Sequence, residues 1–333
     1  MRAAFMPGPG VLEVGDFEVP GITSGQVLVA MRHASVCGSD VHVVFDGFHQ
    51  PDRLGAPGYP GHEGVGVVAD SRSGKFPPGT PVLTVPPGRA GGCFAEFQAV
   101  DGTHLLALPA GSDLRRLLPA QQLGTTLFAM RKFLRAGAAT GQAPRSAAVI
   151  GAGSAGLFFL QQLRRLGCAA VVVSDLNRDR LAVAERLGAT RLVHAPAESV
   201  VEAALDLTGG TGVDLVVEAA GYDRCRQHAV EAVRPRGTLG FFGYPESSGT
   251  APFPVHLAFQ KSVTVEWAAG TQFEPGLRSF REAVDLILRG EIRVDHCLER
   301  AFPLEEAPAA LAAARRQGDG AAKIGIAISE GDR

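Results

Sequence analysis

Two short segments near the start of the chain carry side chains that suit metal binding. They read VCGSDVH and GHEGVG, and their candidate ligands are Cys37, His62 and Glu63. A thiolate, an imidazole and a carboxylate can hold a catalytic zinc ion, which takes about three protein ligands and keeps one position open. The residue types therefore predict a zinc site, provided that the two segments meet in the fold.

Each of the three candidate ligands also has a plain structural interpretation. Cys37 would serve as a small buried hydrophobic residue. His62 would be a core histidine, and Glu63 would be a surface charge. Spacing alone leaves the metal interpretation and the structural interpretation open.

A glycine-rich turn further along the chain suits a dinucleotide. In AAVIGAGSAGLFFLQQL an apolar stretch precedes the turn and a helical pattern follows it. The GxGxxG glycines would permit a tight turn, close approach of the pyrophosphate, and close packing of helix on strand. The alternative is a turn that serves packing alone. The predicted cofactor-binding residues of this turn are Gly151, Gly153, Ser154, Ala155 and Gly156.

Asp175 ends the next predicted strand. A carboxylate there can accept hydrogen bonds from the adenosine ribose and repel a 2′-phosphate, which favours NAD over NADP. Asp175 could instead cap the following helix. Arg178 and Arg180 could favour the phosphate of NADP, or they could lie on the solvated face of that helix. Arg180 is kept as a cofactor-binding candidate.

The elements that must position these residues change in character along the chain. Residues 1 to about 110 resemble short strands between Gly and Pro turns, which predicts a compact all-β unit. Helices are expected at 114–118 and 123–134. From residue 146, strands at 147–150, 170–174, 213–218, 238–242 and 263–267 alternate with helices at 155–166, 178–187 and 224–233. This alternation predicts a parallel, doubly wound sheet.

The tail after residue 270 does not continue that alternation. A helix is expected at 276–288, an extended segment at 294–302, a helix at 304–315 and a final strand at 323–328. The tail is expected to return to the first domain.

Composition sets outer limits. The 333 residues suffice for about two domains, and a net charge of -2 gives no reason to expect a nucleic-acid or membrane partner. Neither a secretory signal nor a long apolar segment is evident, so a cytoplasmic location is expected. The five cysteines are odd in number and widely spaced, which argues against a disulfide framework.

The order of VCGSDVH, GYPGHEGVGVV, GCFAEF and the strand–GAGSAG–helix unit closely resembles the zinc-containing medium-chain alcohol and polyol dehydrogenases. The resemblance implies an α/β protein with a GroES-like β domain and a Rossmann domain. The expected boundaries are 1–118 for the first part of the GroES-like domain, 119–268 for the Rossmann domain, and 269–333 for a segment that returns to the first.

The same resemblance implies roles for individual residues. Cys37 and His62 would bind zinc, and Glu63 would be a ligand or a nearby carboxylate. Asp40 would hold the other ring nitrogen of His62. Ser39 would hydrogen-bond the substrate hydroxyl, and His42 would be the outer end of a proton relay, unless it is only a surface histidine.

Two departures from the family pattern concern the metal. The residue aligned with a further metal ligand is Gln122, whose neutral carbonyl is a weaker ligand. The alternatives are a water in its place, a lower zinc affinity, or a shift of the aligned position by one residue to Gln121. The four-cysteine lobe that binds a structural zinc is missing, because VLTVPPGRAGGCFAEF runs through its position with Cys93 isolated. One catalytic zinc and no structural zinc are therefore expected.

The implied activity is NAD-linked oxidation of a secondary hydroxyl in a polyol, sugar or cyclitol, or the reverse carbonyl reduction. One alternative is a zinc-free quinone or enone reductase on the same scaffold, and another is a non-catalytic dinucleotide-binding sensor. The edge strand near residues 263–268 is expected to pair across a two-fold axis in a homodimer or homotetramer.

Overall fold

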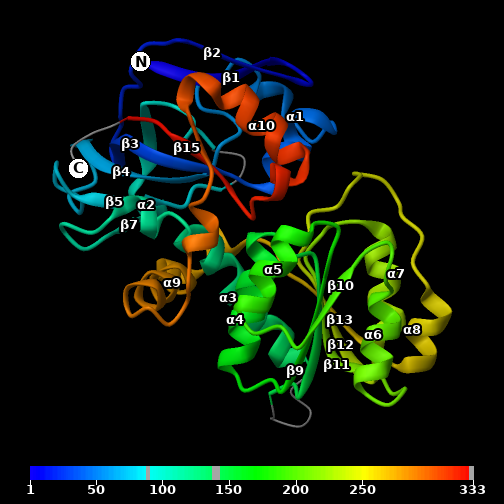
Figure 1. Cartoon of the computed structure of the whole chain (residues 1–333). Coiled ribbons are helices and arrows are strands. Elements are labelled where there is room, and N and C mark those ends of the chain that lie inside the picture. Colours follow the sequence, from blue (N-terminus) through cyan, green and yellow to red (C-terminus); the bar gives the residue numbers. More distant parts are fainter. Residues whose placement is uncertain (88–90, 137–142, 330–333) are drawn as a thin grey trace. The chain divides into compact units, whose positions relative to one another are not determined.

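The computed structural model describes residues 1–87, 91–136 and 143–329 (Figure 1). The chain divides into two compact units. The first unit is Met1–Gly124 together with Gly270–Arg333, and the second unit is Thr125–Ala269. The first division falls inside helix α3 (Ala120–Ala136), whereas the boundary expected from the sequence follows residue 118. The second falls one residue after the boundary at 268.

The first unit is built on a seven-stranded sheet in the order β14-β15-β3-β4-β5-β7, with β6 paired to β3. A separate pair, β1 and β2, forms a two-stranded sheet. Alternate residues of β3 are fully buried, as expected where one face of a strand covers a core. The strands are β1 (Arg2–Gly8), β2 (Val11–Asp16), β3 (Gln26–Val36), β4 (Glu63–Ser71), β5 (Pro81–Thr84), β6 (Phe97–Asp101), β7 (Leu105–Ala107), β14 (Ala301–Pro303) and β15 (Ile324–Ala327).

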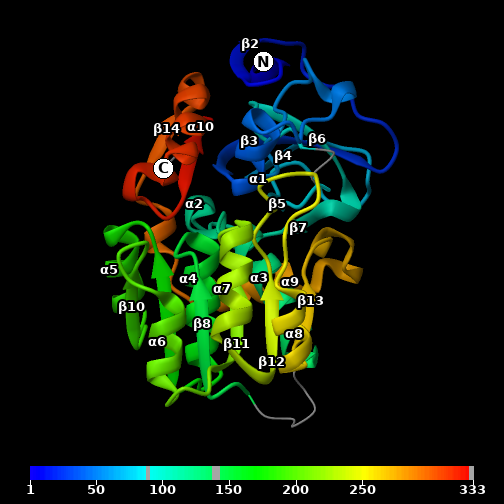
Figure 2. The ribbon, with the colours of Figure 1, turned by 90° about the vertical axis from the view of Figure 1, so that its right-hand side faces the viewer.

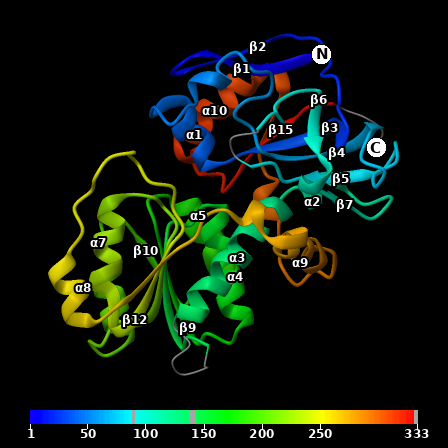
Figure 3. The ribbon, with the colours of Figure 1, turned by 180° about the vertical axis from the view of Figure 1, so that it is seen from behind.

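The tail of the chain contributes directly to this sheet. Strand β15 pairs antiparallel with the end of β3, with Ile324 opposite Val36. Helix α10 (Ala307–Arg315) packs its buried Leu311 into the same core and lies beside α1 (Gly38–Phe45), as Figures 1 and 3 both show. Two further helices of this unit are α2 (Leu114–Leu117) and α9 (Arg278–Leu288).

Two expectations for the first unit are wrong. Its N-terminal part is not all-β, because α1 follows β3 directly. The Asp40 carboxylate accepts a hydrogen bond from the Cys37 backbone nitrogen, 2.9 Å away, which satisfies a donor at the helix start. Residues 294–302 are not extended throughout. A 3-10 turn occupies Asp295–Cys297, and only Ala301–Pro303 forms a strand.

The second unit holds a six-stranded parallel sheet in the order β10-β9-β8-β11-β12-β13, and Figure 2 shows these strands side by side. The central strands are buried on both faces, which explains their continuous apolar sequence. Strand order reverses between β8 and β11, and doubly wound sheets bind ligands outside the carboxyl ends of strands at such a point. The strands are β8 (Ser146–Ile150), β9 (Ala170–Asp175), β10 (Arg191–His194), β11 (Val213–Glu218), β12 (Val233–Phe241) and β13 (Thr264–Trp267).

Helices cover both faces of this sheet. Figures 1 and 3 show α4 (Ser154–Arg165) and α5 (Arg178–Arg186) with α3 on one face. On the other face lie three helices, which are α6 (Val200–Leu207), α7 (Asp223–Ala232) and α8 (Val255–Lys261). The sequence pattern does not indicate β10, α6 and α8, because these short elements lack a long apolar period. Among the residues that the structure describes, no helix is both long and apolar enough to span a membrane.

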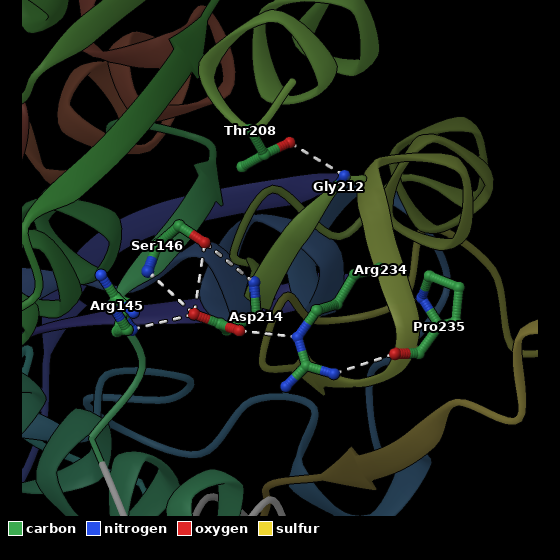
Figure 4. Close-up of polar contacts among 7 residues, drawn as sticks. All are labelled: Arg145, Ser146, Thr208, Gly212, Asp214, Arg234 and Pro235. Atoms are coloured by element: carbon green, nitrogen blue, oxygen red, sulfur yellow. Dashed lines mark hydrogen bonds and ion pairs between the residues drawn. The ribbon is translucent and has the colours of Figure 1, made fainter. Parts of the chain in front are cut away.

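A polar network joins the strands at the amino end of the sheet (Figure 4). Oδ2 of Asp214 on β11 accepts hydrogen bonds from the backbone nitrogens of Arg145 and Ser146, at 2.9 and 3.0 Å. Its Oδ1 lies 2.6 Å from Nε of Arg234 on β12. One carboxylate therefore connects the starts of β8, β11 and β12. Burial opposes its charge, but these donors outweigh burial and lower the pKa of Asp214.

Candidate functional site

The two segments singled out in the sequence meet in the first unit. Cys37 stands at the start of α1, His62 just before β4, and Glu63 at its first position. Their ligand atoms all lie within 4.8 Å of one another. The pairing of β3 with β4 explains part of this arrangement, because it sets Glu63 opposite Ser35, two residues before Cys37.

Asp40 connects two of these residues. Its Oδ1 lies 2.9 Å from Nδ1 of His62, and its Oδ2 accepts the Cys37 amide. Asp40 is only 1% exposed, so the contact is shielded from water. The contact that the resemblance implies between Asp40 and His62 is therefore confirmed. A carboxylate on one ring nitrogen fixes the histidine tautomer and leaves the other nitrogen for a metal.

The electrostatics of His62 also suit a metal ligand. Burial disfavours the charged imidazole, but the Asp40 carboxylate and the neighbouring Cys37 raise the pKa of His62 well above its usual value. A ligand histidine must be neutral, so protons and a metal ion would compete for this ring.

Glu63 is a buried ion-pair partner. It is 2% exposed, so the interpretation of Glu63 as a surface charge is wrong. Its Oε2 lies 2.5 Å from Nζ of Lys323 and accepts a hydrogen bond from Ser35 Oγ, also at 2.5 Å. Burial opposes ionisation, but Lys323 and the other nearby donors lower the pKa of Glu63. The carboxylate is therefore kept ionised beside Cys37 and His62.

Lys323 is a buried neighbour of this cluster that the sequence pattern does not predict. It is 7% exposed and lies just before β15, whose pairing with β3 brings it to Glu63. The available signal was a lysine inside the otherwise apolar segment AAKIGIAI, because lysine is almost never buried without a partner.

Ser39 and His42 both lie on α1. Nδ1 of His42 is 2.8 Å from Oδ2 of Asp46, and its ring lies 5.8 Å from that of Phe48. The side chain of His42 is 19% exposed, so the histidine reaches solvent while Asp46 fixes its orientation. The roles of Ser39 and His42 toward a substrate stay predictions.

The candidate fourth ligand lies in the first turn of α3. Gln121 is 2% exposed, and its Nε2 lies 3.5 Å from the carbonyl oxygen of His62. Gln122 is half-buried, and its ligation of a metal stays a prediction.

Cys93 is fully buried and donates a hydrogen bond from Sγ to the Glu63 carbonyl oxygen, and burial raises the pKa of its thiol. Part of the segment around Cys93, residues 88–90, lies outside the described residues.

The glycine turn of the second unit has the backbone that its sequence predicts. Gly151 adopts φ +100°, where other residues are strained. A Cβ on Gly156 would lie 1.8 Å from the Gly151 carbonyl oxygen, so only glycine lets α4 pack against β8. At Gly153 the nearest atom to such a Cβ is Nη1 of Arg180, 4.0 Å away. Ser154 and Ala155 form the first turn of α4 and are buried.

Asp175, the last residue of β9, contacts the glycine turn and does not cap a helix. Its Oδ2 accepts the Ala152 amide at 2.6 Å, and its Oδ1 accepts the Asn177 amide at 2.8 Å. The N-cap of α5 is Asn177, so the helix-cap interpretation of Asp175 is wrong. Arg178 is exposed, whereas Arg180 is partly buried. Burial lowers the pKa of Arg180, and the nearby Asp175 carboxylate opposes that shift.

Comparisons with known proteins agree with both units. Residues 23–110 match the alcohol dehydrogenase GroES-like domain, and residues 155–289 match the zinc-binding dehydrogenase family. L-threonine 3-dehydrogenase of Bacillus velezensis is 28% identical, over 87% of this chain and 88% of its own length. Sorbitol dehydrogenase of Bacillus subtilis is 24% identical, over 92% of this chain and 91% of its own.

A solved structure extends the similarity to the fold. An alcohol dehydrogenase from Thermus sp. ATN1 is 25% identical and superposes with a TM-score of 0.81, over 99% of this chain and 100% of the other. The same family assignment follows from three observations. They are the two matched domains, the cluster of Cys37, His62 and Glu63, and the glycine turn of a parallel sheet. This chain belongs to the medium-chain dehydrogenase/reductase family, and within it to the zinc-type alcohol and polyol dehydrogenases.

Proposed function

We propose that the chain is a zinc-dependent dehydrogenase that oxidises a secondary hydroxyl of a polyol, sugar or cyclitol with NAD, or reduces the corresponding carbonyl. Membership of the family makes it an oxidoreductase of CH–OH donors. The single observation that carries the proposal is the cluster of Cys37, His62 and Glu63, ordered by the buried Asp40.

The donor set fits zinc. A thiolate and an imidazole are zinc ligands, and a carboxylate within reach completes a site of about three protein ligands. Cys37 and His62 would hold the ion. Glu63 would serve as a third ligand or as a nearby negative charge, because Lys323 and Ser35 already engage its Oε2. Zinc, when bound, supplies a Lewis acid that favours ionisation of the substrate hydroxyl.

The chain's own residues would then move the proton. Ser39 on α1 would accept the hydrogen bond of the substrate hydroxyl. His42, one helical turn away, would pass the proton to solvent, since histidine exchanges protons near neutral pH. Asp46 supports this role by holding Nδ1 of His42 at 2.8 Å, which leaves its Nε2 for the relay.

The second unit would bind NAD at the glycine turn. Gly153 leaves the backbone open to a pyrophosphate at the start of α4, where helix amides favour anions. Asp175 would accept hydrogen bonds from the adenosine ribose and repel a 2′-phosphate. Arg180, close to Gly153, would contact the ribose or the phosphate.

The substrate class rests on the relatives and on general chemistry. Threonine carries its 3-hydroxyl on a secondary carbon, and sorbitol carries several secondary hydroxyls, so two relatives are named for substrates of this kind. A zinc-free quinone or enone reductase would not need the Cys37, His62 and Glu63 cluster. A non-catalytic sensor would need neither that cluster nor the relay residues.

The test is metal content and turnover in three proteins. Wild type should carry about one zinc per chain and oxidise sorbitol or threonine with NAD, whereas Cys37→Ser should lose both properties. Cys225→Ser, at a half-buried cysteine of the second unit, is the matched control and should keep both. Wild type that carries no zinc, does not oxidise polyols and reduces quinones or enones would favour the reductase. Zinc without any turnover on a panel of polyols would favour the sensor.

We also propose that a second copy of the chain pairs along β13. This strand is the end of its sheet and pairs with β12 only, among the described residues. Exposed apolar side chains gather on it and on α8, and they are Val255, Phe259, Val265 and Trp267. Such an edge invites pairing with another strand. Val265→Lys should turn a dimer or tetramer into a smaller species by light scattering, and Val11→Lys on β2 should not. A monomeric wild type would refute this proposal.

A further inference from the structure

Glu218 is a buried carboxyl group at the carboxyl end of β11, beside the glycine turn. It is 0% exposed and lies in register with Ile150, the residue before Gly151. The next residue, Ala219, donates its amide to the Ile150 carbonyl at 2.9 Å. Glu218 therefore stands where strand order reverses, although neither the zinc chemistry nor the proton relay uses it.

One oxygen of Glu218 shapes the loop that follows the strand. Oε1 accepts the amides of Ala220 and Gly221 at 2.7 and 2.6 Å. This loop closely approaches the glycine turn, because a Cβ on Gly151 would lie 3.0 Å from the Ala220 nitrogen. The carboxyl of Glu218 thus fixes the wall of the candidate dinucleotide site.

The other oxygen of Glu218 faces the guanidinium of Arg226 but makes no hydrogen bond to it. Oε2 lies 3.9 Å from Nε of Arg226 on α7, and within the described residues neither atom has a hydrogen-bond partner. The guanidinium is held by Asp223 at 2.5 Å and by the Gly243 carbonyl at 3.3 Å. Its central carbon lies 5.6 Å from the ring centre of Trp267, the single tryptophan of the chain.

The charge of Glu218 changes near neutrality. Burial raises the pKa of Glu218 to about 7, although the two loop amides and Arg226 favour the carboxylate. The other titratable groups that face it are Asp223 and Cys225 on α7, with Glu246 beyond β12 near the Asp223 amide. Its register partners are Ile150 on β8 and Phe241 on β12, and the backbone at Gly243, just after β12, approaches its Oε2. The ionised form makes the stronger bonds to the loop amides and attracts Arg226.

We propose that Glu218 is a positioning residue of the cofactor site, which holds the 219–221 loop against the glycine turn and passes its charge state through Arg226 to Trp267. The inference rests on the proposed dinucleotide site of the second unit. Cofactor should bind more tightly to the form whose carboxylate is ionised, because the loop is then held more firmly. By linkage, affinity should rise with pH by at most about tenfold per unit, the limit for one coupled proton.

The first experiment uses the protein without cofactor. Fluorescence of Trp267, recorded from pH 5.5 to 8.5, should change along a single curve centred near 7, since the distance of a cation from the ring alters its emission. Glu218→Gln should abolish the curve, because glutamine has no charge to change. Arg226→Gln should abolish it too, and Trp267→Phe verifies the origin of the signal. A curve that persists in Glu218→Gln overturns the relay.

The second experiment measures the dissociation constant of NADH by calorimetry at the same pH values. Affinity should rise with pH in wild type and stay flat in Glu218→Gln. In Arg226→Gln the rise should move to higher pH, because a cation that favours the carboxylate is gone. This variant keeps the test valid if Glu218→Gln does not fold. Equal pH profiles in wild type and variants overturn the inference alone. Failure of NADH to bind at any pH overturns the proposed function, and with it the inference.

Discussion

The carboxylate of Asp40 lies 2.9 Å from Nδ1 of His62, and both side chains are buried. The same carboxylate accepts the amide of Cys37. Two candidate zinc ligands from separate segments are thus oriented by a residue that is itself no ligand. The sequence order VCGSD places this carboxylate three residues after the cysteine, where the first turn of α1 brings it back.

Asp40→Asn should weaken zinc binding without removing it. Asparagine can still accept a hydrogen bond from Nδ1, but it lacks the charge that makes the ring a better ligand. The expected loss in zinc affinity is about 10- to 100-fold, measured by competition with a chelator. Asp46→Asn is the control, because Asp46 supports His42 in the same way but away from the cluster, and its zinc affinity should equal that of wild type. Unchanged affinity in Asp40→Asn would contradict the role given to this contact.

Gln122→Glu should tighten zinc binding several-fold, since a carboxylate replaces a neutral amide at the expected fourth ligand. Gln121→Glu is expected to destabilise the fold and not to tighten zinc binding. It would place a charge beside the His62 carbonyl, at a residue that is 2% exposed, and should lower the unfolding temperature instead. Zinc titration and thermal unfolding of both variants separate the two effects. Tighter binding in Gln121→Glu alone would transfer the ligand role to that residue.

Asp175→Ser should move cofactor preference toward NADP. The change removes the charge that would repel a 2′-phosphate and leaves Arg178 and Arg180 in place. The ratio of kcat/KM for NAD to that for NADP should fall by about tenfold or more, which corresponds to about 1.4 kcal/mol. Asp179→Ser, at an exposed carboxylate of α5, provides the comparison and should keep the wild-type ratio. A ratio that also stays constant in Asp175→Ser would mean that the ribose lies elsewhere.

The Asp214 network should stabilise the second unit only above acidic pH. The pKa of Asp214 is lowered in the folded chain, so its contribution is present above the pKa of the unfolded state, about 4, and is lost as pH falls through the folded value. Asp214→Asn should therefore unfold at a lower temperature than wild type at pH 7, with a gap that closes as pH falls below about 4. The gap for Asp206→Asn, at an exposed carboxylate of α6, should stay near zero. If the difference in unfolding temperature between Asp214→Asn and wild type does not depend on pH, the charge of Asp214 does not contribute to stability.

The second unit was largely predictable from sequence because its signals are local. The continuous apolar strands, the GxGxxG turn and the acidic residue that follows it are close to one another in the sequence. The resulting sheet is parallel, as expected. The weak elements were missed for a physical reason. Strand β10 is a four-residue edge strand, and α6 and α8 are short.

The first unit was harder to predict because its contacts are distant in sequence. The strand-like pattern of the N-terminal part obscured α1, where only Asp40 and Val44 are buried. The pairing of Glu63 with Lys323 depends on the register of β15 against β3, which no local pattern specifies. The contact between Asp40 and His62 was predictable because the resemblance supplied the chemical logic for it.

The ion pair between Glu63 and Lys323 can form only late in synthesis of the chain. A ribosome delivers Cys37, His62 and Glu63 early, but Lys323 only after the whole of Thr125–Ala269 has emerged. Until then Glu63 lacks the cation that compensates its burial, and an uncompensated buried charge is unfavourable. The second unit can therefore complete its contacts on the nascent chain, whereas the cluster of Cys37, His62 and Glu63 lacks the cation beside Glu63 until β15 is made. Chains released before residue 323 would contain the whole second unit but not this ion pair.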